Sequence, residues 1–91
     1  MTGYMRVKME FEKGTVVISR AGRDKGYFMV ALDETDGYII VADGKERPLD
    51  RPKRKNPKHL QKTNRKLSLE QLTDKKLRTV LRNQNSTEDS E

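Results

Sequence analysis

Short runs of β-branched and aromatic residues between glycine-containing turns most constrain how this chain can fold. Residues 15–19 read Thr-Val-Val-Ile-Ser directly after Gly14, a composition typical of a short strand. Residues 27–32 and 38–42 have the same character, and no apolar spacing of helical period precedes residue 60. The chain is therefore predicted to be mainly β, with a small antiparallel sheet that curls on itself.

The segments between these runs have the composition of turns. Residues 20–25 are predicted to form a polar loop, and residues 33–37 an acidic hairpin turn that ends in glycine. Asp43-Gly44 is a dipeptide that type I′ hairpins favour, because both of their central residues need positive φ. It predicts a brief return strand over residues 45–48, which Pro48 would end.

The apolar residues of the predicted strands and those near the N-terminus are expected to build the core. Over residues 5–11 they alternate with charged residues, a period of two that indicates a half-buried leading strand. Phe28 and Tyr38 are the aromatic candidates for base stacking on the sheet. Core packing is favoured for Phe28, whereas both roles stay open for Tyr4, Tyr27 and Tyr38.

Positive charge is concentrated in residues 47–66, which we call the basic block. It carries nine Lys/Arg, one Asp and the only His, a net charge of +8 in a chain whose net charge is +6. Residues 1–46, with seven basic and eight acidic side chains, and residues 67–91, with four and five, are each −1. Like charges at this density repel one another unless neutralised, and the commonest neutraliser is a nucleic-acid backbone.

Three prolines lie in the basic block, at positions 48, 52 and 57. Each removes a backbone donor and favours an extended conformation in the residue before it. We therefore expect an extended basic arm over residues 47–63 rather than a helix. Residues 59–61 are candidates for a final strand of the sheet, with Leu60 as its inward anchor.

The C-terminal part has a helical pattern. It begins at Ser68, where Gln71 suits a capping box, and a start at Thr73 or Asp74 is the alternative. The helix would end at about Asn83, and the polar, acidic residues after it are predicted to be disordered. The apolar residues that fall largely on one helix face are Leu69, Leu72, Leu77, Val80 and Leu81.

We therefore divide the chain into three parts. A β domain spans residues 1–63 and includes the basic arm, a linker and helix span residues 64–83, and an acidic tail spans residues 84–91. The 91 residues are 32% apolar and 37% charged, which predicts a thin core. A domain of this size leaves little room for an enclosed catalytic cavity.

The chain lacks the residues that most catalytic and metal sites need. The chain has no Cys and one His, which argues against disulfides, thiol nucleophiles, zinc sites and catalytic triads. Its acidic residues lie in turns and in the tail, and it has no phosphate-cradling glycine motif. We expect a non-enzymatic protein with no cofactor, metal or small-molecule substrate. Without a secretory signal in residues 1–11 or a run long enough for a membrane helix, a cytoplasmic location is expected.

Two basic segments are the candidates for RNA contact. The loop over residues 20–26 combines cations with glycines, so main-chain N–H groups and guanidinium groups can meet phosphates and base edges. The arm would follow a nucleic-acid backbone, since extended chain rises about 3.3 Å per residue. An ordinary polar turn and a solvated charge run are the alternatives. The candidate residues are Arg20, Gly22, Arg23, Lys25, Gly26, Lys45, Arg47, Arg51, Lys53, Arg54, Lys55, Lys58, His59 and Lys62.

The loop and its flanking strands resemble a known motif. Val-Val-Ile-Ser at residues 16–19, Gly-Arg-Asp-Lys-Gly at residues 22–26, an apolar strand, an acidic turn and Tyr-Ile-Ile-Val at residues 38–41 resemble the KOW motif of ribosomal and transcription-elongation proteins. The match spans roughly residues 14–42, and Gly26 falls at the characteristic glycine of the motif.

A second stretch, residues 41–45 and 52–60, is similar to the small bacterial KOW-domain RNA-binding proteins. These are related to the archaeal and eukaryotic large-subunit ribosomal proteins of the L-fourteen-e group. The resemblance implies an SH3-like barrel whose loop before Gly26 and following basic segment touch RNA, and a ribosomal or translational role. Two alternatives stay open: a protein-interaction adaptor that docks through a helix over residues 69–81, and a DNA-binding protein.

Overall fold

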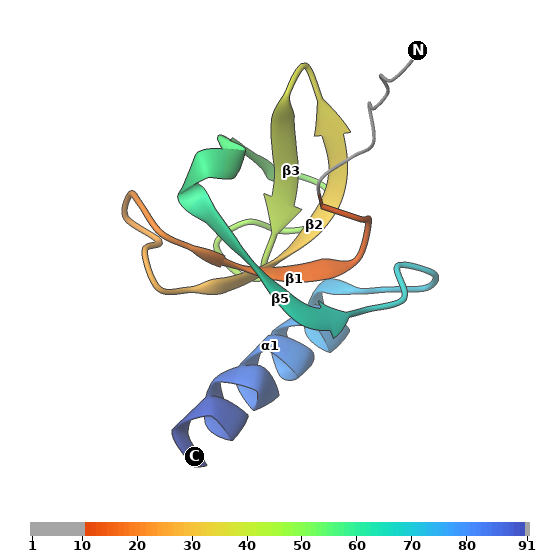
Figure 1. Cartoon of the computed structure of the whole chain (residues 1–91). Coiled ribbons are helices and arrows are strands. Elements are labelled where there is room, and N and C mark those ends of the chain that lie inside the picture. The colour runs from red at the N-terminus through yellow and green to blue at the C-terminus, as the bar shows by residue number, and fades with distance from the viewer. Residues whose placement is uncertain (1–10, 91) are drawn as a thin grey trace.

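A computed structural model describes residues 11–90 of the chain, and the side chains of residues 11–82. The fold is mainly β, with one antiparallel sheet followed by a C-terminal helix (Figure 1). Its elements are β1 (Thr15–Ser19), β2 (Phe28–Thr35), β3 (Tyr38–Ala42), β4 (Lys53–Lys55), the 3₁₀ turn η2 (Pro57–His59), β5 (Leu60–Lys66) and α1 (Asp74–Ser90).

The sheet has the strand order β4-β3-β2-β1-β5, so β1 pairs with both the second strand and the last. Register shifts interrupt the pairing of β1 with β5 and of β2 with β3, and such irregularities bend strands. The two edge strands, β4 and β5, are joined through η2, and the sheet is not closed. The predicted antiparallel sheet is therefore confirmed, as an open one.

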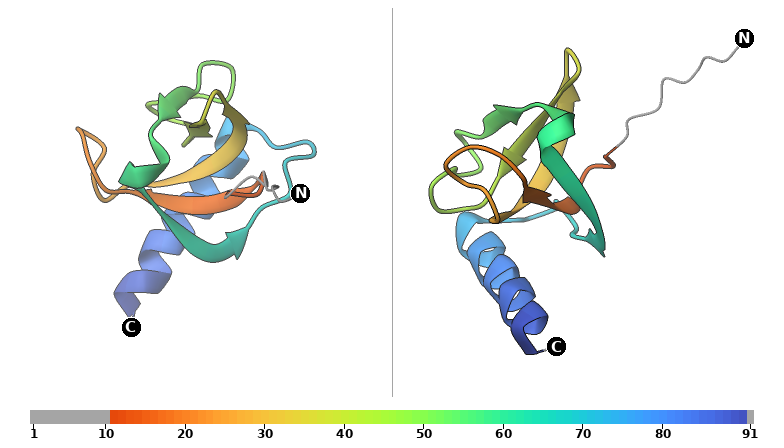
Figure 2. Two further views of the ribbon diagram at one scale, coloured as in Figure 1. Left: turned by 45° about the horizontal axis from the view of Figure 1, so that its top comes forward. Right: turned by 60° about the vertical axis from the view of Figure 1, so that its left-hand side comes forward.

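Both faces of the sheet are apolar, which explains why β1 and β2 read as nearly continuous hydrophobic runs. Val17 and Met29 belong to an inner cluster with Phe11 and Leu60, on one face. Their neighbours, such as Val16, belong to an outer cluster on the other face, which α1 covers (Figure 2). Phe28 is part of the outer cluster, as expected.

Helix α1 begins at the later of the two predicted starts. Lys76 N donates to Thr73 Oγ1 at 3.2 Å and Leu77 N donates to Thr73 O at 2.9 Å, so Thr73 caps the first turn. The start at Ser68 is wrong, because Gln71 has φ +58°, which a right-handed helix does not accommodate. The end at Asn83 is also wrong, since the backbone is helical through Ser90, into the segment predicted to be a disordered tail.

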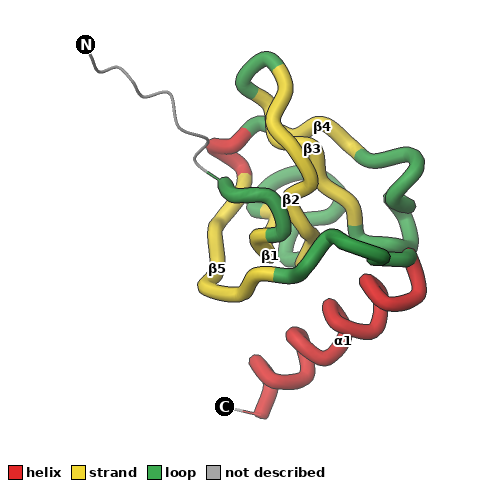
Figure 3. The backbone as a smooth tube through the Cα atoms, turned by 90° about the vertical axis from the view of Figure 1, so that its right-hand side faces the viewer, coloured by secondary structure: helices red, strands yellow, loops and turns green. Residues whose placement is uncertain are grey.

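The loop between β3 and β4 reaches the start of the helix (Figure 3). Leu49 N donates to Asp74 Oδ1 at 2.8 Å, and Arg78 Nη1 donates to the carbonyl oxygen of Gly44 at 2.8 Å. A Cβ atom at Gly44 would lie 2.6 Å from the carbonyl oxygen of Asp74. Glycine is therefore required there for the close approach of helix and loop.

Three strand predictions need adjustment. Strand β2 starts at Phe28 and continues to Thr35, so the turn shrinks to Asp36-Gly37. No strand forms over residues 45–48: Asp43 N and Gly44 N both donate to Arg47 O, which closes a loop. Asp43 also lacks the positive φ of a type I′ turn. The predicted leading strand lies outside the described residues, except for Phe11, which is buried.

The segment predicted as an extended arm over residues 47–63 has no α-helix and is extended in β4 and β5, but it does not protrude as an arm. Its C-terminal half is folded into the sheet as β4, η2 and β5. Leu60 is the inward anchor that the sequence suggested, and β5 runs to Lys66, past the expected domain boundary. Pairing with β1 gives the backbone of β5 the hydrogen bonds that a protruding arm would have had to make with water.

Candidate nucleic-acid interface

The β1–β2 loop, residues 20–27, is held by its own backbone hydrogen bonds. Gly26 N donates to Ser19 O at 2.7 Å, and Tyr27 N donates to Asp24 O at 2.9 Å. Gly26 has φ +90°, and nothing lies within 4 Å of a Cβ atom built there. The glycine is therefore explained by backbone conformation and not by crowding within the protein. Gly22, with φ +87°, lies in the same loop.

Asp24 anchors this loop to β4. Its carboxylate accepts hydrogen bonds from Ser19 Oγ at 2.6 Å and from Lys55 Nζ at 2.8 Å, and Lys53 Nζ lies 3.4 Å away. Lys55 Nζ also donates to the carbonyl oxygen of Ala21 at 2.9 Å. We call the set formed by these five residues the Asp24 cluster. It ties a loop to a strand about thirty residues later in the chain.

The charges in this cluster change the acidity of its carboxyl group. Burial alone would raise the pKa of Asp24, but hydrogen bonds from Lys55 and Ser19 and the positive charges of Lys55 and Lys53 outweigh it. The pKa falls from 3.8 to about 2. Asp24 therefore stays ionised at any pH at which the protein is expected to be used.

Lys55 does not fit the role in RNA contact that the sequence suggested. Its side chain is only 6% exposed, and its ammonium group is already neutralised by Asp24. Moving it out to a phosphate would leave a carboxylate without its partner in a mostly buried position. Lys53, which is 31% exposed, shares the same carboxylate but retains access to solvent.

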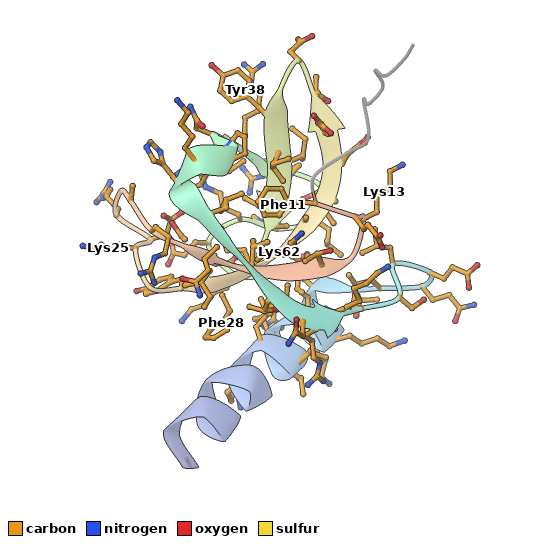
Figure 4. All side chains as sticks on the ribbon, viewed as in Figure 1. Phe11, Lys13, Lys25, Phe28, Tyr38 and Lys62 are labelled. Carbon is orange, nitrogen blue, oxygen red and sulfur yellow. The ribbon has the colours of Figure 1, made fainter. Side chains whose placement is uncertain are left out.

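Other candidates lie on the β1–β2 loop and on η2, two segments that are in contact, and we call their exposed residues the basic face. The backbone N–H of Arg20 donates to the carbonyl oxygen of His59 at 2.8 Å, so the loop lies against η2. Figure 4 shows Lys25 at the outer end of the loop, on the opposite side of the molecule from Lys13. The basic face consists of the exposed residues Arg20, Arg23, Lys25, Lys58 and His59.

The β3–β4 loop adds further cations next to the β1–β2 loop. Arg47 and Lys53 line a cleft of about 290 Å³ together with Arg23. Lys45 lines a second cleft of about 320 Å³, together with Gly26 and residues of α1. Arg51 is exposed in the same β3–β4 loop. Candidates from the β1–β2 loop and from the segment that follows β3 therefore line the same two clefts.

Arg54 and Lys62 belong neither to the clefts nor to the basic face. The guanidinium carbon of Arg54 lies 5.3 Å from the centroid of the Tyr38 ring, and Figure 4 shows Tyr38 at the far end of the sheet from Lys25. Lys62 is exposed on β5, opposite Val17 of β1. Arg54 thus has a local packing partner, as expected for a guanidinium group above an aromatic face.

Sequence reasoning missed two basic residues that line a cleft, and it left the role of Tyr27 open. Arg78 and Arg82 of α1 line the second cleft, and Tyr27 lines both. The two arginines carried a signal, because their four-residue spacing places them on the polar side of the helix. Only the tertiary structure brings them to the β1–β2 loop.

The helix proposed as a partner surface is largely used within the protein. Leu77 and Leu81 are buried in the outer cluster, and Leu69 and Leu72 pack against it. The apolar face over residues 69–81 is therefore mostly covered by the sheet.

Within the part of the chain that the structure describes, no group of three or more acidic or histidine side chains is placed to hold a metal ion. None of the helices in that part has the length and apolar character needed to cross a membrane. Neither a protein-family model nor a curated protein matches this chain.

Proposed function

We propose that this protein binds structured RNA, with ribosomal RNA as the foremost candidate, and that it does so without catalysis. One observation carries the proposal: the β1–β2 loop and η2, which both carry exposed cations, lie against each other where the backbone of Arg20 donates to that of His59. The Asp24 cluster fixes the loop relative to β4. Because the backbone of the loop is already fixed, binding of phosphates costs the conformational entropy of the exposed side chains but not that of the loop.

The strand order supports the finer fold assignment, an SH3-like domain of the KOW type. The two edge strands, β4 and β5, follow one another in the chain through the short η2, and two pairings carry register shifts; both features favour a curled sheet, and curling of this kind builds small barrels. The basic loop before Gly26 lies at one end of that sheet, where the resemblance to KOW domains expects RNA. A place on the ribosome, and with it a cytoplasmic location, follows as part of this proposal.

The charge available predicts the salt dependence of binding. Arg20, Arg23, Lys25 and Lys58 of the basic face, with Arg47 beside them, give about five cations able to neutralise phosphates. Log affinity for duplex RNA is then expected to fall with log salt at a slope of about −4 to −5.

The test is a titration of the whole chain with a ribosomal RNA fragment, between low and physiological salt, with duplex DNA of the same length as competitor. We expect the slope given above and displacement of RNA only by excess DNA. A slope near zero would overturn the electrostatic mechanism. Equal competition by DNA would instead identify a general polyanion-binding protein. Cross-linking in cells, followed by sequencing of the bound RNA, identifies the target.

A protein-interaction role is the second candidate, and one observation favours it. Leu67, Leu72 and the half-buried Val80 line an apolar cleft between the linker and α1. Val80→Lys places a charge there without touching the basic face. If this variant retains RNA affinity but no longer co-sediments with ribosomal particles, the adaptor hypothesis gains; unchanged co-sedimentation counts against it.

A further inference from the structure

Tyr27 is an aromatic residue in an unusual place. It is 53% exposed, at the point where the basic β1–β2 loop enters β2. Its backbone is fixed, because Tyr27 N donates to Asp24 O and Tyr27 O accepts from Ser19 N. Among the described residues, none forms a hydrogen bond, ion pair or ring contact with the Tyr27 side chain. A large apolar ring is thus presented to solvent from a rigid position.

The two clefts of the interface meet at this residue. Tyr27, Asp43 and Glu46 line both of them, one cleft of about 290 Å³ and one of about 320 Å³. Volumes of this size are at the small end of the range for ligand sites. A cleft beside an exposed aromatic ring therefore suits one flat aromatic group, such as a nucleobase, better than a larger ligand.

The charge around the ring favours an anionic ligand. Two of the three acidic residues in the clefts are already engaged: Asp24 with Lys55, and Asp43 Oδ1 with the backbone N–H groups of Lys45 and Arg47. Six cations line the same two clefts. They are Arg23, Arg47 and Lys53 in the first, and Lys45, Arg78 and Arg82 in the second.

We propose that Tyr27 stacks against an unpaired base of the bound RNA, while the side chains of Arg23 and Arg47 hold the adjoining phosphates. This rests on the proposed function and adds the form of RNA that is recognised: a loop, bulge or single strand rather than a continuous duplex. Bases in those regions can be splayed out and stacked on aromatic side chains, whereas bases in an A-form duplex cannot.

Tyr38 offers a matched comparison. It is exposed to a similar degree, 42%, but the guanidinium group of Arg54 already lies over its ring. Removing the Tyr38 ring therefore tests whether any exposed tyrosine of this protein contributes to binding. We expect only Tyr27 to do so.

The experiment compares two probes on the full chain at fixed salt: a 12-nucleotide RNA without self-complementarity, and the duplex that it forms with its complement. Base–aromatic stacking is worth about 1–3 kcal/mol, so Tyr27→Ala is expected to weaken single-strand binding about 5- to 150-fold. Duplex binding should change less than about twofold. The salt slope should not change, because no charge is removed. Tyr27→Phe should bind as the wild type does, and Tyr38→Ala should retain the single-strand preference.

Tyr27→Leu keeps an apolar side chain but cannot stack, and it replaces Tyr27→Ala if that variant melts below the assay temperature. If Tyr27→Leu binds the single strand as tightly as the wild type does, the stacking proposal is overturned and the proposed function is left intact. Equal losses for single strand and duplex would also overturn it. Failure of the wild type to bind either probe at low salt would overturn the proposed function itself.

Discussion

Lys55 and Lys58 lie three residues apart in the same basic block, yet the structure gives them opposite environments. Lys55 is buried at the end of β4 and is paired with Asp24, whereas Lys58 is exposed on η2. The first holds the β1–β2 loop in place, and the second belongs to the surface that the loop helps to form. The net charge of a block therefore overstates the number of cations available to a partner, since part of it is used within the fold.

The largest expected effect on stability comes from breaking the ion pair between Lys55 and Asp24. Asp24→Asn leaves the ammonium group of Lys55 buried without a counter-charge, and losing one partner of a buried ion pair costs about 3–5 kcal/mol. We expect the free energy of unfolding in urea to fall by this amount. Glu34→Gln, at an exposed acidic residue of β2, is the control and should change it by less than about 0.5 kcal/mol. Equal stability of both variants would show that the Asp24 cluster contributes nothing.

The acid dependence of the free energy of unfolding tests the Asp24–Lys55 pair in the wild-type protein. The pKa of Asp24 is lowered to about 2 from 3.8, so the stabilisation is fully present above about pH 5 and is lost as the pH falls through 2. The shift corresponds to about 2 kcal/mol. Urea unfolding from pH 6 down to pH 2 should show this loss in the wild type. Asp24→Asn should lack that part of the slope; a parallel decline in both proteins would contradict the assignment.

A smaller effect on stability is expected from replacing Gly26, which lies at the end of the β1–β2 loop next to β2. Its φ of +90° strains any other residue, but a Cβ atom there meets nothing within 4 Å. Gly26→Ala should therefore lower the free energy of unfolding by about 1 kcal/mol. Gly44→Ala is the comparison, because its Cβ atom would lie 2.6 Å from Asp74 O, and it should cost clearly more. The opposite order would mean that the loop is crowded after all.

Replacing Arg54 tests whether an exposed cation of the basic block that lies outside the proposed interface contributes to RNA binding. Its contact with Tyr38 is on the surface, and such cation–π pairs contribute about 0.5–1 kcal/mol. Arg54→Ala should lower the melting temperature by a few degrees at most and should leave RNA affinity within about twofold of the wild type. A loss of RNA affinity as large as that of Lys58→Gln would extend the interface to the far end of the sheet.

Local sequence patterns were sufficient for β1 and β3, whose bounds match the predicted runs. They failed where distant residues decide the structure. The arm predicted over residues 47–63 had the charge and prolines of an extended segment, but Leu60 in the inner core and the Lys55–Asp24 pair fold its second half into the sheet. The sequence indicated Leu60 as an anchor for residues 59–61, but it gave no sign of β4 or of the Lys55–Asp24 pair, because their partners lie elsewhere in the chain.

The candidate site shows the same division. The loop cations were found from the Gly-Arg-Asp-Lys-Gly sequence alone, whereas Lys55 was assigned to RNA because its type and position matched those of its neighbours. One signal was present: Asp24 is the only acidic residue in an otherwise basic loop, which favours a structural ion pair for it, although the sequence does not indicate which cation is the partner. For Tyr27 the sequence left base stacking and core packing open, since its exposure depends on where β2 begins.

The most direct test of the account is the salt dependence of RNA affinity in a triple variant, Arg23→Gln, Lys25→Gln and Lys58→Gln, measured beside the wild type with one ribosomal RNA duplex. Each lost phosphate contact should reduce the slope by about 1, so we predict a slope about 3 units shallower and an unchanged melting temperature. An unchanged slope in a folded variant would show that these exposed cations do not contact RNA, and would contradict the account.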